Sequence, residues 1–133
     1  MSIIAEIKKI PNLYHVEGCT TSQIKDAQKM LGITFPDEYI DYVKEYGAIS
    51  FYGTEWTGLN VDGYMNVVEA TKQEREINDS FPADCFVIEN LGIDGIVTIA
   101  DENGIIYSLQ YSRKEKICNS LTEYLKLCMD RAN

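Results

Sequence analysis

Residues 85–111 read CFVIENLGIDGIVTIADENGIIYSLQY, and this stretch decides the fold class. Its three runs of apolar and β-branched residues predict strands over Cys85–Glu89, Ile96–Ala100 and Ile105–Tyr111. The last two strands flank Asp101-Glu102-Asn103-Gly104, where Asn-Gly predicts a tight hairpin with both central residues at positive φ. The stretch therefore predicts a mostly antiparallel sheet.

Three helices are predicted before this sheet. Isoleucines spaced along residues 3–10 favour a short helix that ends before a proline. Thr20-x-x-Gln23 forms a capping box that begins a second helix, and Gly32 ends it. The clearest helix has Pro36 at its first position and Gly47 at its end. Its apolar stripe follows the spacing i, i+3, i+4, i+7 and consists of Tyr39, Tyr42, Val43 and Tyr46.

The middle of the chain and its C-terminal part complete the pattern. Residues 49–64 are rich in aromatics and glycines, which predicts one or two irregular strands. Asn66 can cap a helix that runs to about Asn78, and Ser120-x-x-Glu123 caps a final helix. N-terminal helices, a mostly antiparallel sheet with one inserted helix, and a C-terminal helix predict an α+β fold. With no repeat or linker in view, we expect a single domain over residues 1–133.

Composition and charge narrow the functional classes. The chain has 133 residues, 12 Lys+Arg and 21 Asp+Glu, for a formal net charge of −9. Such a chain repels phosphates, so we expect no direct binding to nucleic acid or to an anionic membrane, whereas a basic protein partner fits. No signal peptide or apolar span is visible, and the four cysteines lack metal or redox spacing. These features predict a cytoplasmic protein with reduced thiols.

Catalytic patterns are weak in this sequence. Its one histidine, His15, has no motif that ties it to Cys19 or Cys85, so a nucleophile–base pair is unsupported. The many carboxylates make any glycosidase pair uninformative, and no phosphate-binding glycine loop is present. Asp101-Glu102-Asn103-Gly104 lacks the spacing of a calcium loop and is better interpreted as a turn. We therefore predict a protein that is not an enzyme and uses no cofactor or metal.

The remaining candidate is a binding surface of aromatic and acidic side chains in the β region. Tyrosine and tryptophan suit interfaces because they add large contact area and keep a polar tip. The alternative is that Trp56 and the tyrosines, including Tyr107 and Tyr111, belong to the core, and the sequence leaves both interpretations open. The candidate partner-binding residues are Tyr52, Glu55, Trp56, Asp62, Tyr64, Asp94, Asp101 and Glu102.

One further pattern spans the clearest helix. Leu31-Gly32-x-x-Phe35-Pro36-x-x-Tyr39-x-x-Tyr42-x-x-x-Tyr46-Gly47-Ala48 resembles the start of the SUKH superfamily, although Tyr46 stands where that family often has Asn. The likeness rests on the order and spacing of several motifs over nearly the whole chain. The other motifs are the glycine–tryptophan region at Gly53, Trp56 and Gly58, the stretch Val87-Ile88-Glu89-Asn90 before Gly92-x-Asp94-Gly95, and the hairpin Glu102-Asn103-Gly104-x-x-Tyr107.

This resemblance implies an α+β domain with a non-catalytic role. Bacterial SUKH proteins are chiefly immunity proteins that bind and block toxin domains, often nucleases. The leading hypothesis is therefore an antitoxin that occludes the active site or substrate surface of a basic toxin domain. The alternative is an adaptor that recruits cellular proteins, like the yeast relative that regulates cell-wall glucan synthesis. The sequence does not decide whether the chain self-associates.

Overall fold

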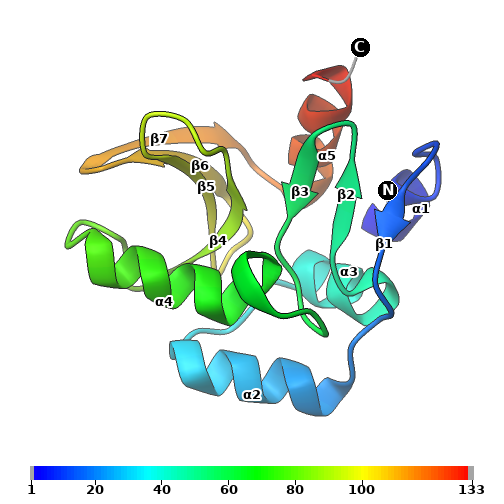
Figure 1. Cartoon of the computed structure of the whole chain (residues 1–133), viewed down its shortest axis with the longest axis horizontal. Coiled ribbons are helices and arrows are strands. Elements are labelled where there is room, and N and C mark those ends of the chain that lie inside the picture. Colours follow the sequence, from blue (N-terminus) through cyan, green and yellow to red (C-terminus); the bar gives the residue numbers. More distant parts are fainter. Residues whose placement is uncertain (1, 132–133) are drawn as a thin grey trace.

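Two antiparallel sheets and five α-helices form the described part of the chain, residues 2–131 of a computed structural model, so the α+β prediction is confirmed (Figure 1). A short 3-10 helix, η1, precedes the fourth α-helix. The elements in chain order are α1 Ile3–Ile7, β1 Tyr14–His15, α2 Thr21–Leu31, α3 Asp37–Tyr46, β2 Ile49–Phe51, β3 Thr54–Trp56, η1 Gly63–Met65, α4 Val67–Ile77, β4 Cys85–Asn90, β5 Ile96–Asp101, β6 Ile106–Gln110, β7 Arg113–Cys118 and α5 Leu121–Arg131.

The strands form two separate sheets, whereas the sequence predicts a single sheet. The first has the order β1-β2-β3 and the second the order β4-β5-β6-β7, and every pairing between neighbouring strands is antiparallel. Just after β3, Thr57 links the sheets: its N–H donates to the Ile88 carbonyl at 2.8 Å, and its hydroxyl donates to the Val87 carbonyl at 2.7 Å. In Figure 1 the second sheet curves away from β2 and β3, with α4 beneath it.

Local capping signals place the helix ends close to where the sequence predicts them. Thr20 and Gln23 exchange side chain–backbone hydrogen bonds as a capping box. Gly32 ends α2 in the left-handed region at φ 69°, where glycine avoids the steric cost of a Cβ. Pro36 is the N-cap of α3 and not its first helical residue. The Asn66 side chain accepts hydrogen bonds from two N–H groups at the start of α4, as predicted.

The turn between β5 and β6 differs from the expected Asn-Gly turn. There only Gly104 has positive φ, and the Asp101 carboxylate accepts hydrogen bonds from the N–H groups of Asn103 and Ile105. The hairpin is therefore present but is built on the aspartate, which corrects the prediction of two central residues at positive φ. That geometry occurs instead between β2 and β3, where Tyr52 has φ 43° and Gly53 has φ 82°.

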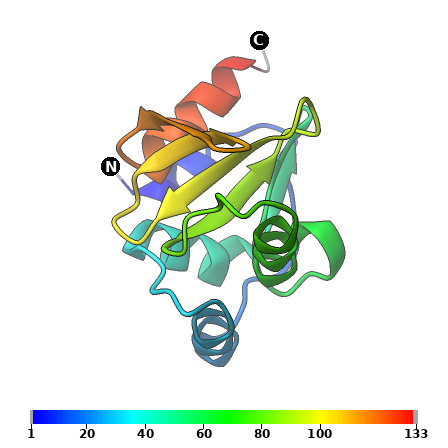
Figure 2. The same cartoon turned by 90° about the vertical axis from the view of Figure 1, so that its left-hand side faces the viewer.

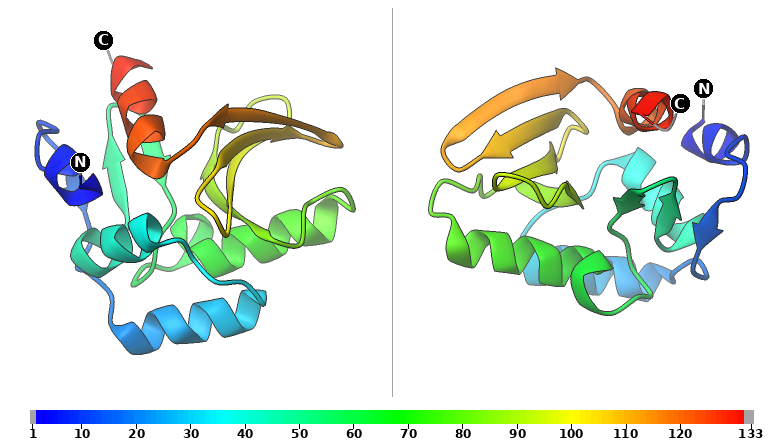
Figure 3. Two further views of the ribbon diagram at one scale, coloured as in Figure 1. Left: turned by 180° about the vertical axis from the view of Figure 1, so that it is seen from behind. Right: turned by 45° about the horizontal axis from the view of Figure 1, so that its top comes forward.

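A large core and a small core lie on opposite faces of the second sheet. The large core lies between α1, α2, α3, α5 and the inner face of the first sheet. Inside it the Trp56 ring meets Tyr42 edge-on and stacks on Tyr124. The small core contains fewer side chains and is covered by α4 (Figures 2 and 3). Its buried residues are Phe81, Cys85, Val87, Val97, Ile99 and Leu109.

The last helix is fixed by polar contacts at both ends. At its start the Glu38 carboxylate, from α3, accepts hydrogen bonds from the N–H groups of Leu121 at 2.9 Å and Thr122 at 3.3 Å. At its end the Arg131 guanidinium donates to the buried Glu89 carboxylate of β4 at 3.0 Å. Within residues 2–131, no helix combines the length and apolar character needed to cross a bilayer.

Candidate functional site

The outer face of the first sheet carries tyrosines around one carboxylate. Cross-strand pairing places Tyr14 opposite Ser50 and Ser50 opposite Glu55, so these three residues form a row on one face of the sheet. Tyr64, from η1, extends the row by donating a hydrogen bond from its hydroxyl to the Glu55 carboxylate at 2.7 Å. We call Tyr14, Tyr52, Glu55 and Tyr64 the tyrosine face.

The three tyrosines are solvent-exposed, and side-chain hydrogen bonds hold two of them, Tyr52 and Tyr64. The exposed fractions of Tyr14, Tyr52 and Tyr64 are 71%, 57% and 68%. The Tyr52 hydroxyl accepts a hydrogen bond from the Asn12 side chain at 3.3 Å, and the hydrogen bond to Glu55 raises the pKa of Tyr64. Such rings offer a partner large contact area with little conformational entropy left to lose.

Turn geometry positions the two tyrosines that lie outside the strands. Tyr52 occupies the first central position of the β2–β3 turn, at positive φ. Tyr64 sits in η1, which is fixed because the Glu69 carboxylate accepts a hydrogen bond from the Gly63 N–H at 2.9 Å. The Asn66 side chain adds a hydrogen bond to the Val61 carbonyl at 2.9 Å. The side chains of Asn66 and Glu69 therefore fix the backbone on which Tyr64 is carried.

Beside this segment lies an acidic hollow between α2 and α4. Its volume is ≈ 540 Å³, and it is lined by the carboxylates of Asp26, Asp62 and Glu69. Exposed Met30 and half-buried Val68 supply apolar surface, and no lysine, arginine or histidine of residues 2–131 lines it. The hollow thus combines negative charge with apolar contacts next to the tyrosine face.

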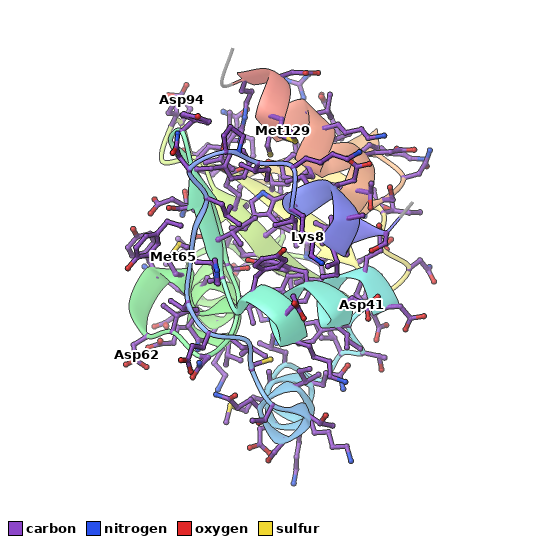
Figure 4. The ribbon with its side chains drawn as sticks, turned by 90° about the vertical axis from the view of Figure 1, so that its right-hand side faces the viewer. Lys8, Asp41, Asp62, Met65, Asp94 and Met129 are labelled. Atoms are coloured by element: carbon purple, nitrogen blue, oxygen red, sulfur yellow. The ribbon has the colours of Figure 1, made fainter. Side chains whose placement is uncertain are left out.

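The structure brings together only part of the predicted surface. Tyr52, Glu55 and Tyr64 belong to the tyrosine face, and Asp62 directly precedes η1. Asp94 is in the β4–β5 loop at φ 52°, and Figure 4 shows its side chain near the top of the view, well above Asp62.

The predicted residues in the β5–β6 hairpin have structural partners. The Asp101 side chain is nearly buried and accepts hydrogen bonds within its own hairpin and from the Tyr107 hydroxyl. Glu102 accepts a hydrogen bond from the Thr34 N–H at 2.7 Å and so links the hairpin to the loop before α3. These two carboxylates therefore stabilise local structure and lie outside the tyrosine face.

Trp56 is the clearest departure from the predicted surface. Its exposed fraction is 0%, and its ring stacks on Tyr124 and meets Tyr42 edge-on, with centroids 5.9 and 5.4 Å apart. Side chains alternate between the faces of a strand, so Glu55 and its neighbour Trp56 point to opposite sides of β3. The sequence already contained this signal. Trp56 is a core residue here and presents no surface to a partner.

The residues considered for nucleophilic chemistry are not activated. Burial raises the pKa of the Cys85 thiol to about 12 and also raises that of Cys19, which favours the unreactive protonated form. A ring nitrogen of His15 lies 2.7 Å from the Val16 carbonyl oxygen, and its ring packs edge-on against Tyr46. All four cysteines are free. Among residues 2–131, no three His, Cys, Asp or Glu side chains gather closely enough to hold a metal ion.

Sequence reasoning missed Tyr14 as a member of the face. It lies in a two-residue strand whose only ladder is with β2, more than thirty residues away in sequence. No local pattern marks such a strand, so the pairing itself is the only signal.

Comparison with known proteins adds one family. The chain matches the model of the SUKH_5 family, described as SMI1-KNR4 cell-wall, over residues 1–130. No curated protein matches the chain.

Proposed function

The chain belongs to the SUKH_5 (SMI1-KNR4) family, and on that premise we propose that it is an immunity protein which binds and neutralises a toxin domain. The family consists in general of non-catalytic immunity and regulatory domains. The observation that carries the proposal is the tyrosine face, three exposed tyrosines arranged around Glu55.

The chemistry of the face suits a basic protein partner. A nuclease must attract phosphate, so its substrate surface is basic, and a chain of net charge −9 is drawn to the same surface. Complementary charge mainly speeds association and selects the partner, while aromatic contact area slows dissociation. We propose that the tyrosine face supplies the aromatic contacts. The adjacent acidic hollow, which includes Asp62, supplies the negative electrostatic potential that attracts the basic partner. Binding there would cover the substrate surface of the toxin.

The test is co-expression with the toxin domain encoded beside this gene. We expect cell survival and a complex that copurifies. Tyr64→Ala should weaken the complex by about 2 kcal/mol, as for an aromatic hot spot, and Tyr14→Ala by less. Leu127→Ala is the matched control, because Leu127 is an exposed apolar residue on α5, away from this face. Continued killing, with no complex at micromolar concentrations, would falsify the proposal.

A second candidate is an adaptor that recruits cellular proteins, and the cell-wall description of the matching family favours it. The same face would then bind a partner that is not a toxin. Gene neighbourhood separates the two candidates: an adjacent toxin gene favours immunity, and an isolated gene favours the adaptor.

A further inference from the structure

A groove made of two adjoining hollows lies between α4 and the end of β4 with the loop that follows it. Two hollows of ≈ 280 and ≈ 200 Å³ lie along it, and both are lined by Glu74 of α4 and Asn90 of β4. Val87 lines the first hollow and Val97 the second, and both valines belong to the small core. Both hollows are therefore backed by the small core, although the two valines are themselves buried.

Large apolar side chains surround the groove. Tyr64 lines the first hollow, while Ile77 and Tyr111 line the second. Ile93 projects from the β4–β5 loop, and the exposed fractions of these four side chains lie between 62% and 69%. The Tyr111 ring is seated closely on Gly95, where an added Cβ would come within 2.8 Å of a ring carbon. Single exposed apolar residues are ordinary, but three that line two adjoining hollows favour a protein contact.

Glu74 lies within this apolar setting without a partner. Its side chain is half-buried, and burial raises its pKa. Among residues 2–131, no group donates a hydrogen bond to its carboxylate, and no lysine, arginine or histidine lines either hollow. A carboxylate that has lost water without gaining a cation is compensated when a partner brings one.

We propose that this groove binds a lysine or arginine side chain of the toxin domain, flanked in the toxin by apolar residues. The cation pairs with Glu74, and the flanking side chains pack against the exposed apolar side chains of Tyr64, Ile77 and Tyr111. This inference rests on the proposed function, since it names the chemistry of the toxin segment. Tyr64 joins the two surfaces, because it bonds to Glu55 of the tyrosine face and also lines the groove.

The test uses a random dodecapeptide library displayed on phage and selected on the folded chain. We expect the selected peptides to carry arginine or lysine beside large apolar residues. A synthetic copy of a selected arginine peptide should shift the backbone amide NMR signals of Ala70, Gln73, Asn90 and Gly95. Glu74→Gln should weaken its binding about tenfold, the range of a hydrogen bond to a charged group. The matched control is Glu76→Gln, which removes the same charge from an exposed site on the same helix and should leave the affinity unchanged.

A second peptide carries citrulline, which is neutral and nearly isosteric, in place of arginine. The citrulline peptide should bind wild type about tenfold more weakly than the arginine peptide does. The Glu74→Gln variant should bind the two peptides with the same affinity. Peptides that bind Glu74→Gln as tightly as wild type, or that shift amides outside the groove, overturn the inference. Sedimentation that shows a dimer with these amides protected also overturns it, since a second copy then fills the groove. If arginine peptides occupy the groove but the toxin neither binds nor is neutralised, the immunity function fails and the cation site stands.

Discussion

The two faces of the first sheet use the same residue type in opposite ways. On the inner face, the Tyr42 hydroxyl is completely buried, accepts a hydrogen bond from the Ile49 N–H at 3.1 Å and donates to the Thr57 carbonyl at 2.8 Å. On the outer face, Tyr52 and Tyr64 hydrogen-bond only to side chains and leave most of their rings in water. The comparison teaches that the inner tyrosine satisfies backbone groups and holds the fold, whereas the outer tyrosines are free to serve a partner.

The largest effect that could break this comparison is at Trp56. Truncating a fully buried aromatic leaves a cavity and removes contacts with Tyr42 and Tyr124, so Trp56→Ala should lower the free energy of unfolding by about 3–5 kcal/mol. Tyr64→Ala, on the outer face, should lower it by less than about 0.5 kcal/mol. Urea unfolding followed by far-ultraviolet circular dichroism measures both. Equal losses would contradict the division between the faces.

A single hydroxyl tests the same division more finely. Tyr42→Phe keeps the ring but leaves the buried Ile49 N–H and Thr57 carbonyl without their partner, so we expect a loss of about 1–3 kcal/mol. Tyr52→Phe removes an exposed hydroxyl and should change the free energy of unfolding by less than about 0.5 kcal/mol. The control is the far-ultraviolet spectrum, which both variants should share with wild type. A neutral Tyr42→Phe would show that water or neighbouring groups replace the hydroxyl.

A smaller effect is expected at the edge of the large core, where Glu38 of α3 caps α5. Removing the carboxylate leaves two N–H groups at the start of α5 without their acceptor, so Glu38→Ala should cost about 1 kcal/mol. Glu45→Ala changes an exposed glutamate of the same helix and should be nearly neutral. Thermal unfolding of the pair measures the difference. If both variants melt at the same temperature, the cap contributes nothing and α5 is held by packing alone.

Local signals explain why much of the fold could be predicted from the sequence. The helix ends at Thr20 and Asn66 follow from side chains that bond to nearby N–H groups, so a few neighbouring residues contain the whole cause. β7 was missed because Arg113–Cys118 is an exposed edge strand of mostly charged residues and has no apolar alternation to reveal it. β1 was missed because its two residues become a strand only by pairing with β2.

The site was predicted less well because a surface is made by long-range register. Glu55 and Tyr64 are near in sequence and do meet, whereas Tyr14 reaches them only through Ser50. Composition left Trp56 open between the surface and the core, although alternation along β3 separates it from Glu55. The groove beside α4 had no signal at all, because its walls come from a helix and a loop whose separation depends on packing.

The smallest predicted effect on the free energy of unfolding is at Glu74. It tests whether this side chain stabilises the fold or is kept for a partner. Burial raises the pKa of Glu74, so the folded chain binds a proton there more tightly than the unfolded chain does. The ionised carboxylate therefore costs stability at neutral pH, and this cost disappears as the pH falls below the unfolded pKa of about 4.3. Glu74→Gln should raise the free energy of unfolding at pH 7 by a few tenths of a kcal/mol, since the half-exposed group is screened by water. At pH 3 it should match wild type.

Glu76→Gln removes the same charge from an exposed position of α4, so general relief of charge repulsion would affect both variants alike. A gain at pH 7 for Glu74→Gln alone would mean that the groove retains a carboxylate at the expense of stability. A side chain kept only for its structural role is not expected to lower the free energy of unfolding when it ionises. A partner that supplies the missing cation reverses that loss, so Glu74→Gln should raise stability in the free chain and lower affinity in the complex. Equal effects of the two variants at pH 7 would remove the reason to regard Glu74 as a residue held for binding.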